Sequence, residues 1–262
     1  MKWNYDHLFP HGSIRESQRE AIDFVLDEII TSDKRFVIVE AGTGVGKSAI
    51  GLTVARHLDE NMNHVDGFED GAYFVTTQKI LQDQYFRDFG HPRGKMRSIK
   101  SSSNYACSYH KQNTCKDSQQ MLKIEDKSSR FFKACTLNCV YKNDKAKFIE
   151  SCESVTNFPY LLTESTYSGK ITPRKFIVID EAHNIETELS KFIEITISER
   201  FCKHTLKLQW PGSETQYQSV KWVKEVYHPK IKSQLSFMEK RIEETGIKHR
   251  IEEFTKISKQ LD

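Results

Sequence analysis

The chain has 262 residues, a formal net charge of +3 and a mean hydropathy of −0.61. This length allows one or two domains, and no apolar run approaches the roughly 18 residues that a membrane-spanning helix needs. The first residues also lack the apolar centre of a signal peptide, so we expect no membrane partner and a location in the cytoplasm, with the nucleoid, or in a nucleus. Six cysteines in such a chain favour free thiols, metal ligands or cluster ligands over a disulfide framework.

Charge is distributed unevenly along the chain. Residues 90–150 hold 13 Lys+Arg against 5 Asp+Glu, a local charge of +8, so the remainder carries −5. The same stretch loses the apolar periodicity of its flanks and contains four of the six cysteines. We interpret residues 100–150 as a subdomain inserted between the first part, 1–99, and the second part, 151–194, of one α/β domain.

Helices and strands are predicted in alternation on both sides of the insert. The expected elements are a helix over Arg15–Ile30, a buried strand over Arg35–Val39, a helix over Ser48–Leu58, a strand over Ala72–Val75, a helix over Lys79–Phe89 and, after the insert, a strand over Lys175–Ile179. This alternation is typical of an α/β fold with a parallel sheet. From Pro229 onward, apolar residues recur at helical spacing on both sides of Gly246, so we expect a helical pair within an incomplete helical segment, 195–262.

A glycine-rich turn follows the strand expected over residues 35–39. Its residues are Glu40, Ala41, Gly42, Thr43, Gly44, Val45, Gly46, Lys47 and Ser48. Backbone N–H groups in such a turn can wrap phosphates at the amino end of a helix, where Lys47 would reach the β and γ phosphates and Ser48 would hold Mg2+. The strict pattern has glycine at position 41, and a turn without nucleotide is the alternative. The context favours an ATP–Mg2+ site.

Two carboxylates follow the strand expected over residues 175–179. A sheet that hydrolyses nucleotides needs one carboxylate for Mg2+ and a second one to activate water. We assign the first role to Asp180 and the second to Glu181, and we include His183 in the catalytic group. Taken alone, the pair could be a solvated strand end, but together with the phosphate loop it predicts ATP hydrolysis.

The order of phosphate loop, cysteine-bearing insert and Asp-Glu-Ala-His-Asn resembles the XPD/DinG-like branch of superfamily-two DNA helicases. Arg15–Gln18 is similar to the family's adenine-reading segment, with Gln18 as the adenine partner, and Thr76–Gln84 is similar to its first DNA-contacting motif. Asn104–Cys107 and Val155–Leu162 resemble the two borders of its cluster domain. The resemblance implies a RecA-like motor domain, the start of an arch domain in the tail, and ATP-dependent unwinding with 5′ to 3′ polarity. Its implied partners are single-stranded DNA or DNA junctions, and its usual setting is DNA repair.

Four clustered cysteines have the spacing C-x7-C-x19-C-x3-C; they are Cys107, Cys115, Cys135 and Cys139. The resemblance implies that these four thiolates hold a [4Fe-4S] cluster. The family's Lys-Gly-Arg reads Lys100-Ser101-Ser102 here and its Cys-Pro-Tyr reads Cys139-Val140-Tyr141, so zinc with His110 as a substitute ligand, or unligated thiols, are alternatives. Cys152 and Cys202 are interpreted as small buried or half-buried residues.

The insert mixes aromatic residues with Lys and Arg, which suits either single-strand binding or a small aromatic core. Helicases of this kind have a second motor domain whose arginines complete the ATP site. The motifs recognised here do not extend into such a domain. We therefore expect a fragment or a short product, acting as a monomer. The alternatives are an ATP- and nucleic-acid-binding module without autonomous helicase activity, or a P-loop ATPase with a structural zinc insert.

Overall fold

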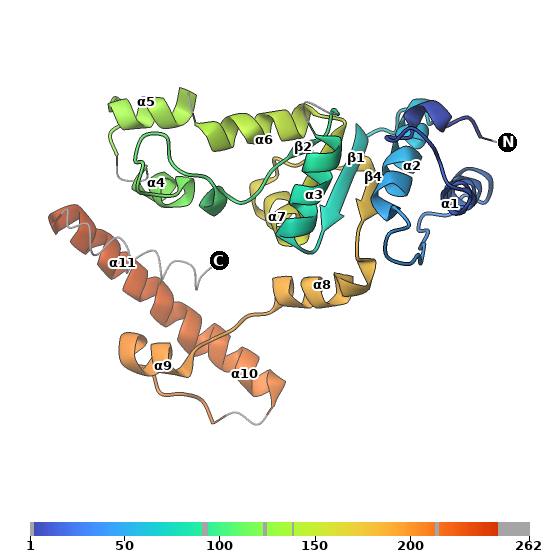
Figure 1. The fold of residues 1–262 in the computed structure, drawn as a ribbon. Coiled ribbons are helices and arrows are strands. Elements are labelled where there is room, and N and C mark those ends of the chain that lie inside the picture. The colour runs from blue at the N-terminus through green and yellow to red at the C-terminus, as the bar shows by residue number, and fades with distance from the viewer. Residues whose placement is uncertain (1–2, 91–93, 123–124, 138, 213–214, 246–262) are drawn as a thin grey trace. The chain divides into compact units, whose positions relative to one another are not determined.

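The computed structural model describes residues 3–90, 94–122, 125–137, 139–212 and 215–245 (Figure 1). The chain divides into two compact units, residues 1–193 and residues 194–262. Among the described residues, no helix has the length and apolar character that crossing a bilayer requires.

A four-stranded parallel sheet is the centre of the first unit. Its strands are β1 (Glu69–Thr76), β2 (Arg97–Ser98), β3 (Glu153–Asn157) and β4 (Arg174–Ile179). They lie in the order β2-β3-β1-β4, and every neighbouring pair is parallel. Parallel neighbours need crossover connections, which helices supply here. The α/β class with a parallel sheet is therefore confirmed.

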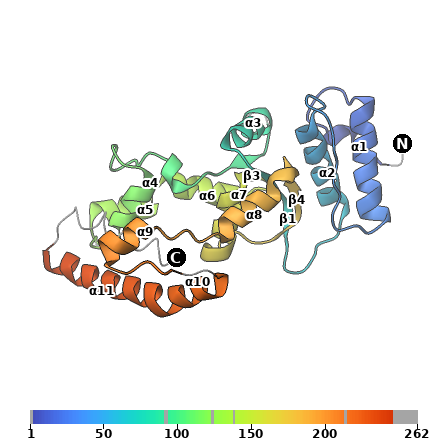
Figure 2. The same cartoon turned by 90° about the horizontal axis from the view of Figure 1, so that it is seen from below.

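Helices cover both faces of this sheet. The α-helices of the first unit are α1 (Glu16–Leu26), α2 (Lys47–Asn61), α3 (Lys79–Phe89), α4 (Cys115–Met121), α5 (Arg130–Leu137), α6 (Val140–Glu150), α7 (Phe158–Thr163) and α8 (Ile185–Ile193). Short 3-10 or π turns are η1 (Asp6–Leu8), η2 (Asp27–Thr31), η3 (Ser102–Asn104), η4 (Glu164–Ser168) and η5 (Ala182–Asn184). Figure 2 shows α1 and α2 side by side, and both contribute to one apolar core.

Alternate residues of β1 point into two different cores. Ala72 and Phe74 lie in the core formed with α1, α2 and α3, whereas Tyr73 and Val75 lie in the core formed with α6 and α7. Burial on both faces explains why this strand is a continuous apolar run rather than an alternating one. In α2, a Cβ at Gly51 would lie 2.8 Å from Val178 Cγ1, so glycine permits the close packing of α2 on β4.

The strand expected over residues 35–39 is not formed. Val37 and Val39 pack against the core of α1, α2 and α3, but Phe36 and Ile38 are each 83% exposed. This alternation is strand-like, yet no strand pairs with the segment in the described part of the chain, where β4 is one of the two edge strands of the sheet. An apolar, β-branched sequence forms a strand only beside a partner, which the sequence alone does not identify.

The second unit is helical. Its elements are α9 (Glu199–Phe201), η6 (Cys202–Leu206), α10 (Gln216–Trp222), η7 (Val223–Tyr227) and α11 (His228–Thr245). Its core contains Cys202, Leu206, Tyr227 and Ile231. The first helix of the predicted pair is α11, and the second helix, beyond Gly246, lies outside the described residues.

Candidate nucleotide and nucleic-acid site

The glycine-rich turn leads directly into the amino end of α2. The helix begins at Lys47, and the two glycines before it, Gly44 and Gly46, have φ of 79° and 87°. Glycine adopts this left-handed conformation at little cost, so these positions allow the tight turn that other residues would strain. The free backbone N–H groups at the start of a helix favour anions. The turn is therefore shaped as an anion site.

Lys47 lies across the turn. Its Nζ donates a hydrogen bond to the Ala41 carbonyl oxygen at 3.1 Å, which holds the ammonium group beside the loop backbone. Gly42, Thr43 and Gly44 are exposed. A cation and an exposed loop backbone thus face the same space, as phosphate binding requires.

Gln18 connects α1 to the phosphate loop. Its Nε2 donates to the Val45 carbonyl oxygen at 2.8 Å, its Oε1 accepts from the Arg15 N–H at 2.9 Å, and the residue is 5% exposed. Arg15 also donates to the Gly44 carbonyl oxygen at 3.2 Å. Both ends of the carboxamide are engaged, so Gln18 fixes the loop against α1. Its role in reading adenine stays a prediction.

A buried tyrosine joins the two residues expected to hold Mg2+. Asp180 follows β4, and its N–H donates to the Val75 carbonyl oxygen at 2.9 Å, which places it at the carboxyl end of the sheet. The hydroxyl of Tyr85 interacts with the side chains of both Ser48 and Asp180, and each contact shifts its pKa. Ser48 and Asp180 are thus brought together through Tyr85, which is 3% exposed. The sequence gives no signal for this role, since a tyrosine in α3 is indistinguishable from an ordinary core residue.

The electrostatics of Asp180 favour a nearby cation. Burial raises the pKa of its carboxyl group, and the neighbouring charge of Glu181 raises it as well. The Glu181 backbone N–H, the Lys47 ammonium and the Tyr85 hydroxyl oppose this shift, but the pKa stays above its ordinary value. A carboxylate whose charge is poorly solvated is stabilised when a divalent cation binds next to it.

Glu181 has an unusual backbone conformation. Its φ is 54°, and its N–H donates to Asp180 Oδ1 at 3.0 Å. A left-handed residue other than glycine costs about 1–3 kcal/mol, and such strain clusters at functional sites. Its side chain is 35% exposed, and Oε2 lies 3.4 Å from His183 Nδ1. The carboxylate is therefore within reach of solvent water, beside a surface histidine.

Part of the segment expected to contact DNA is buried. Gln82 is 0% exposed; its Nε2 donates to Ser98 Oγ at 2.8 Å and to the Ile99 carbonyl oxygen at 2.7 Å, and its Oε1 accepts from Asn157 Nδ2 at 3.1 Å. These bonds fasten α3 to β2 and to the end of β3. Gln82 is therefore structural, and within α3 the exposed side chains, such as Ile80, are the ones accessible to a ligand.

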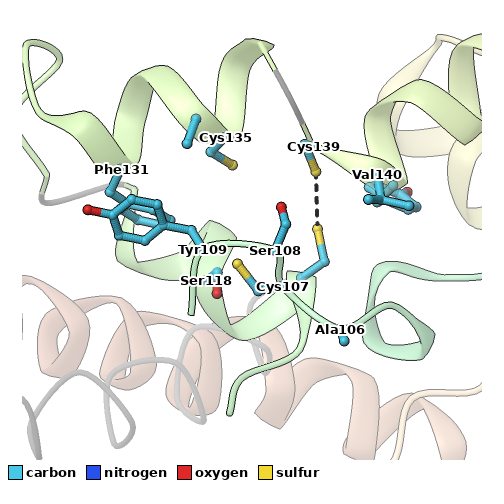
Figure 3. Close-up of a pocket in the computed structure, with 12 residues that line it drawn as sticks. Ala106, Cys107, Ser108, Tyr109, Ser118, Phe131, Cys135, Cys139 and Val140 are labelled. Atoms are coloured by element: carbon cyan, nitrogen blue, oxygen red, sulfur yellow. Dashed lines mark hydrogen bonds between the residues drawn. The ribbon is translucent and has the colours of Figure 1, made fainter. Parts of the chain in front are cut away.

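The four clustered cysteines line one cavity in the insert (Figure 3). Cys115, Cys135 and Cys139 are buried and Cys107 is half-buried. The Sγ atoms of Cys115 and Cys139 lie 3.7 Å apart, joined by the dashed line in Figure 3. Two thiolates on one tetrahedral zinc would lie about 3.8 Å apart, given Zn–S bonds of about 2.3 Å.

Four thiols are a suitable set of ligands for one inorganic group, but their present positions leave little room for it. The cavity between them is only about 10 Å³, and no three His, Cys, Asp or Glu side chains of the described residues are arranged to hold one metal ion. Burial, together with the neighbouring thiols, raises the pKa of Cys115 to about 12. Burial also acts to raise the pKa of Cys107, but the nearby Ser118 hydroxyl and a hydrogen bond from the His110 N–H at 3.3 Å bring it below its ordinary value. Positive charge between the thiols would be needed to ionise all four.

The remaining cysteines have different environments. Cys202 is buried in the core of the second unit, as expected. Cys152 is exposed, so its prediction as a buried or half-buried residue is wrong. It lies directly before β3, where its carbonyl oxygen accepts from the Ala72 N–H at 2.8 Å. The backbone of Cys152 therefore forms a hydrogen bond with β1, while its side chain remains at the surface.

The phosphate loop ahead of α2 and the carboxylates after β4 together define a P-loop domain of the nucleotide-hydrolysing class. Residues 11–210 match the family described as "Type III restriction enzyme, res subunit", and the chain belongs to this family. It is a family of ATP-hydrolysing helicases and nucleases in superfamily two, and the four-stranded parallel sheet is consistent with a RecA-like helicase domain. The comparison with curated proteins and the comparison with solved structures found no match.

Proposed function

We propose that this helicase-like domain binds ATP with Mg2+ and single-stranded DNA, as part of an ATP-dependent DNA helicase of the XPD/DinG type. The observation that carries the proposal is the link from Ser48 through Tyr85 to Asp180. This link supports the proposal because a nucleotide-bound Mg2+ requires a loop hydroxyl and a strand-end carboxylate close to each other.

The residues act in distinct ways at this site. The loop backbone and Lys47 bind the β and γ phosphates, and Ser48 and Asp180 would hold Mg2+. The bound ion neutralises charge on the phosphate oxygens. Glu181 orients the attacking water and accepts its proton, because its carboxylate is exposed enough to meet solvent while its backbone is fixed on Asp180.

We further propose that the insert holds a [4Fe-4S] cluster on Cys107, Cys115, Cys135 and Cys139. The support is that all four thiols line one cavity although they come from separate segments of the chain. Such a group would fasten the loop before α4 to α5 and α6, which is a structural role. The 3.7 Å separation of Cys115 and Cys139 favours zinc as the second candidate.

The proposed function is tested by two titrations of the same protein. A fluorescent ATP analogue with Mg2+ and a labelled oligo-dT strand are each expected to bind with a stoichiometry of one. Binding of neither ligand would overturn the proposal. Binding of the nucleotide alone would leave a P-loop ATPase without the nucleic-acid role.

A further inference from the structure

A second cavity lies at the junction between the insert and the sheet. Its volume is about 440 Å³, and its walls come from α3, β2, η3 and α6. This volume lies within the range of about 300–1,000 Å³ that is usual for ligand sites. None of its lining residues belongs to the phosphate loop or to the cysteine cavity.

Positive charge dominates the walls of this cavity. Arg97, Lys100 and Lys147 line it, against the single carboxylate of Asp144. Asp144 lies close enough to the Tyr105 hydroxyl that its charge raises the pKa of that group, in addition to the larger effect of burial. Lys100 pairs with Asp83, outside the cavity lining, at 2.5 Å. Two cations therefore remain for a ligand.

The side chains of Arg97 and Lys147 have no hydrogen bond or ion pair with any other residue that the structure describes. Both line the same cavity, one from the edge strand β2 and one from the last turn of α6. Cations gathered at one cavity repel each other unless an anion lies between them. The arrangement thus favours an anionic ligand.

Hydrogen bonds connect the segments that form two sides of this cavity. Ser98 and Ile99, which lie between Arg97 and Lys100 in the chain, both accept hydrogen bonds from the buried Gln82. On the neighbouring wall, Lys79 Nζ donates to Asn104 Oδ1 at 3.0 Å, which ties η3 to the start of α3. The segments around the cations are therefore ordered before a ligand binds, which lowers the entropy cost of binding.

An aromatic ring lies beside these cations. Phe86, on α3, lines the same cavity and is 37% exposed, so part of its ring is open to a flat partner. Cations for phosphates together with rings for bases are the combination that single-strand binding uses.

We propose that this cavity is a subsite for one nucleotide of a single strand, with Arg97 and Lys147 on its phosphodiester group and Phe86 stacked on its base. The inference rests on the proposed nucleic-acid function and names the place where the strand contacts this unit.

Charge removal tests the phosphate contacts. The double variant Arg97→Gln/Lys147→Gln is compared with the matched double variant Lys111→Gln/Lys133→Gln, which removes the same charge from exposed positions of the insert outside the cavity. Affinity for labelled oligo-dT is measured by fluorescence anisotropy across a range of salt concentrations. The cavity variant should lose about tenfold or more in affinity, and its salt slope should fall by about 0.7, the change expected for one phosphate contact. The control pair should keep the wild-type slope.

Base removal tests the ring. Phe86→Leu should weaken binding of oligo-dT by about fivefold but leave binding of an abasic strand of the same length unchanged. Inorganic phosphate and dTMP are used as competitors, and only the nucleotide should compete at low millimolar concentration. Equal competition by phosphate would overturn the base contact and leave an anion site.

The outcomes also separate this inference from the proposed function. If the wild type binds oligo-dT and the cavity variant binds it equally well, or both double variants lose the same affinity, the subsite is wrong while the nucleic-acid function stands. If the wild type binds no strand, both are wrong. Circular dichroism and thermal melting of each variant confirm that the fold is retained.

Discussion

The hydroxyl of Tyr85 is the single group whose removal reports most selectively on the Mg2+ site. Tyr85→Phe keeps the ring in the core and deletes the interactions of the hydroxyl with Ser48 and Asp180. Ser48 and Asp180 then lose the group that both contact. The Mg2+ concentration that gives half-maximal nucleotide binding should therefore rise by about fivefold, which corresponds to a loss of about 1 kcal/mol of binding free energy. Nucleotide affinity measured in EDTA should stay unchanged.

Tyr73→Phe is the matched control. It removes another hydroxyl of the same unit, one that donates to the Thr172 carbonyl oxygen at 3.0 Å, away from the loop. An equal change of Mg2+ dependence in both variants would mean that Tyr85 acts only through stability.

Glu181→Gln separates binding from hydrolysis. The amide has nearly the shape of the carboxylate but cannot accept the proton of the attacking water. The variant should bind Mg2+ and ATP with the affinity of the wild type, and turnover should fall by about 100-fold or more, as is usual when a general base is removed. The two quantities are measured by nucleotide titration and by phosphate release. Unchanged turnover would remove Glu181 from the role of base.

Among single residues, the sequence identifies those whose function follows from a local pattern of neighbours. Lys47 and Ser48 are recognisable because a glycine-rich turn before a helix has few other uses. Tyr85 and Gln82 are not recognisable, since their roles depend on groups from distant parts of the chain, such as Asp180 and Asn157. A side chain whose function is to join two others has no local pattern.

Among the elements, the contact between α6 and the turn after α7 ties the insert to the sheet domain. Lys145 and Glu164 form an ion pair there, with side chains 13% and 16% exposed. Burial acts to raise the pKa of Glu164, but Lys145, Ser168 and Tyr141 together hold it below its ordinary value. A depressed carboxyl pKa contributes stability above the unfolded-state pKa, and this contribution is lost as the pH falls through the folded-state pKa.

Glu164→Gln should therefore lower the melting temperature at pH 7. The difference between wild type and variant should shrink as the pH is lowered into the acid range where Glu164 itself becomes protonated. Thermal melts over a pH series measure this difference. A difference that is independent of pH would show that packing, and not the ion pair, makes the contact.

Elements with their own partners were easier to predict than the segment over residues 35–39. The predicted strands over 72–75 and 175–179 and the predicted helix over Lys79–Phe89 coincide with β1, β4 and α3, apart from their ends. The segment at 35–39 has equally apolar residues, but its strand character depends on a neighbour that the described chain does not provide. Sheet formation is a property of pairs of segments, so composition alone overpredicts it.

For the whole molecule, the α/β class followed from the sequence but the arrangement of strands did not. β2 and β3 are paired neighbours, although the insert at 100–150 separates them in the chain. A basic, cysteine-bearing sequence indicates that a subdomain interrupts the sheet domain, but not between which strands it leaves and returns. That information lies in the hydrogen bonds of the sheet edge.

The proposed cluster makes a prediction about the insert as a unit. If four thiolates hold iron and sulfide, the protein purified without oxygen is brown and absorbs broadly near about 400 nm, whereas a zinc protein is colourless. Cys135→Ser should bleach the colour and lower the melting temperature of the insert, because ligands supply folding energy to a small subdomain. Cys152→Ser, at an exposed position, is the control and should keep the colour.

Metal analysis decides between the alternatives. A colourless protein with one zinc per chain would replace the cluster by zinc and leave the nucleotide site unaffected. Colour that survives Cys135→Ser would show that this thiol is not a ligand.

The central claim, that the loop and the sheet end form one ATP–Mg2+ site, is tested most directly by calorimetric titration of the chain with ATP in Mg2+ and in EDTA. We predict one site per chain, with binding strengthened by Mg2+ in the wild type and lost in Lys47→Ala. In Asp180→Asn, residual binding should no longer depend on Mg2+. Wild-type binding that Mg2+ does not strengthen, or binding that Lys47→Ala leaves intact, would contradict the account.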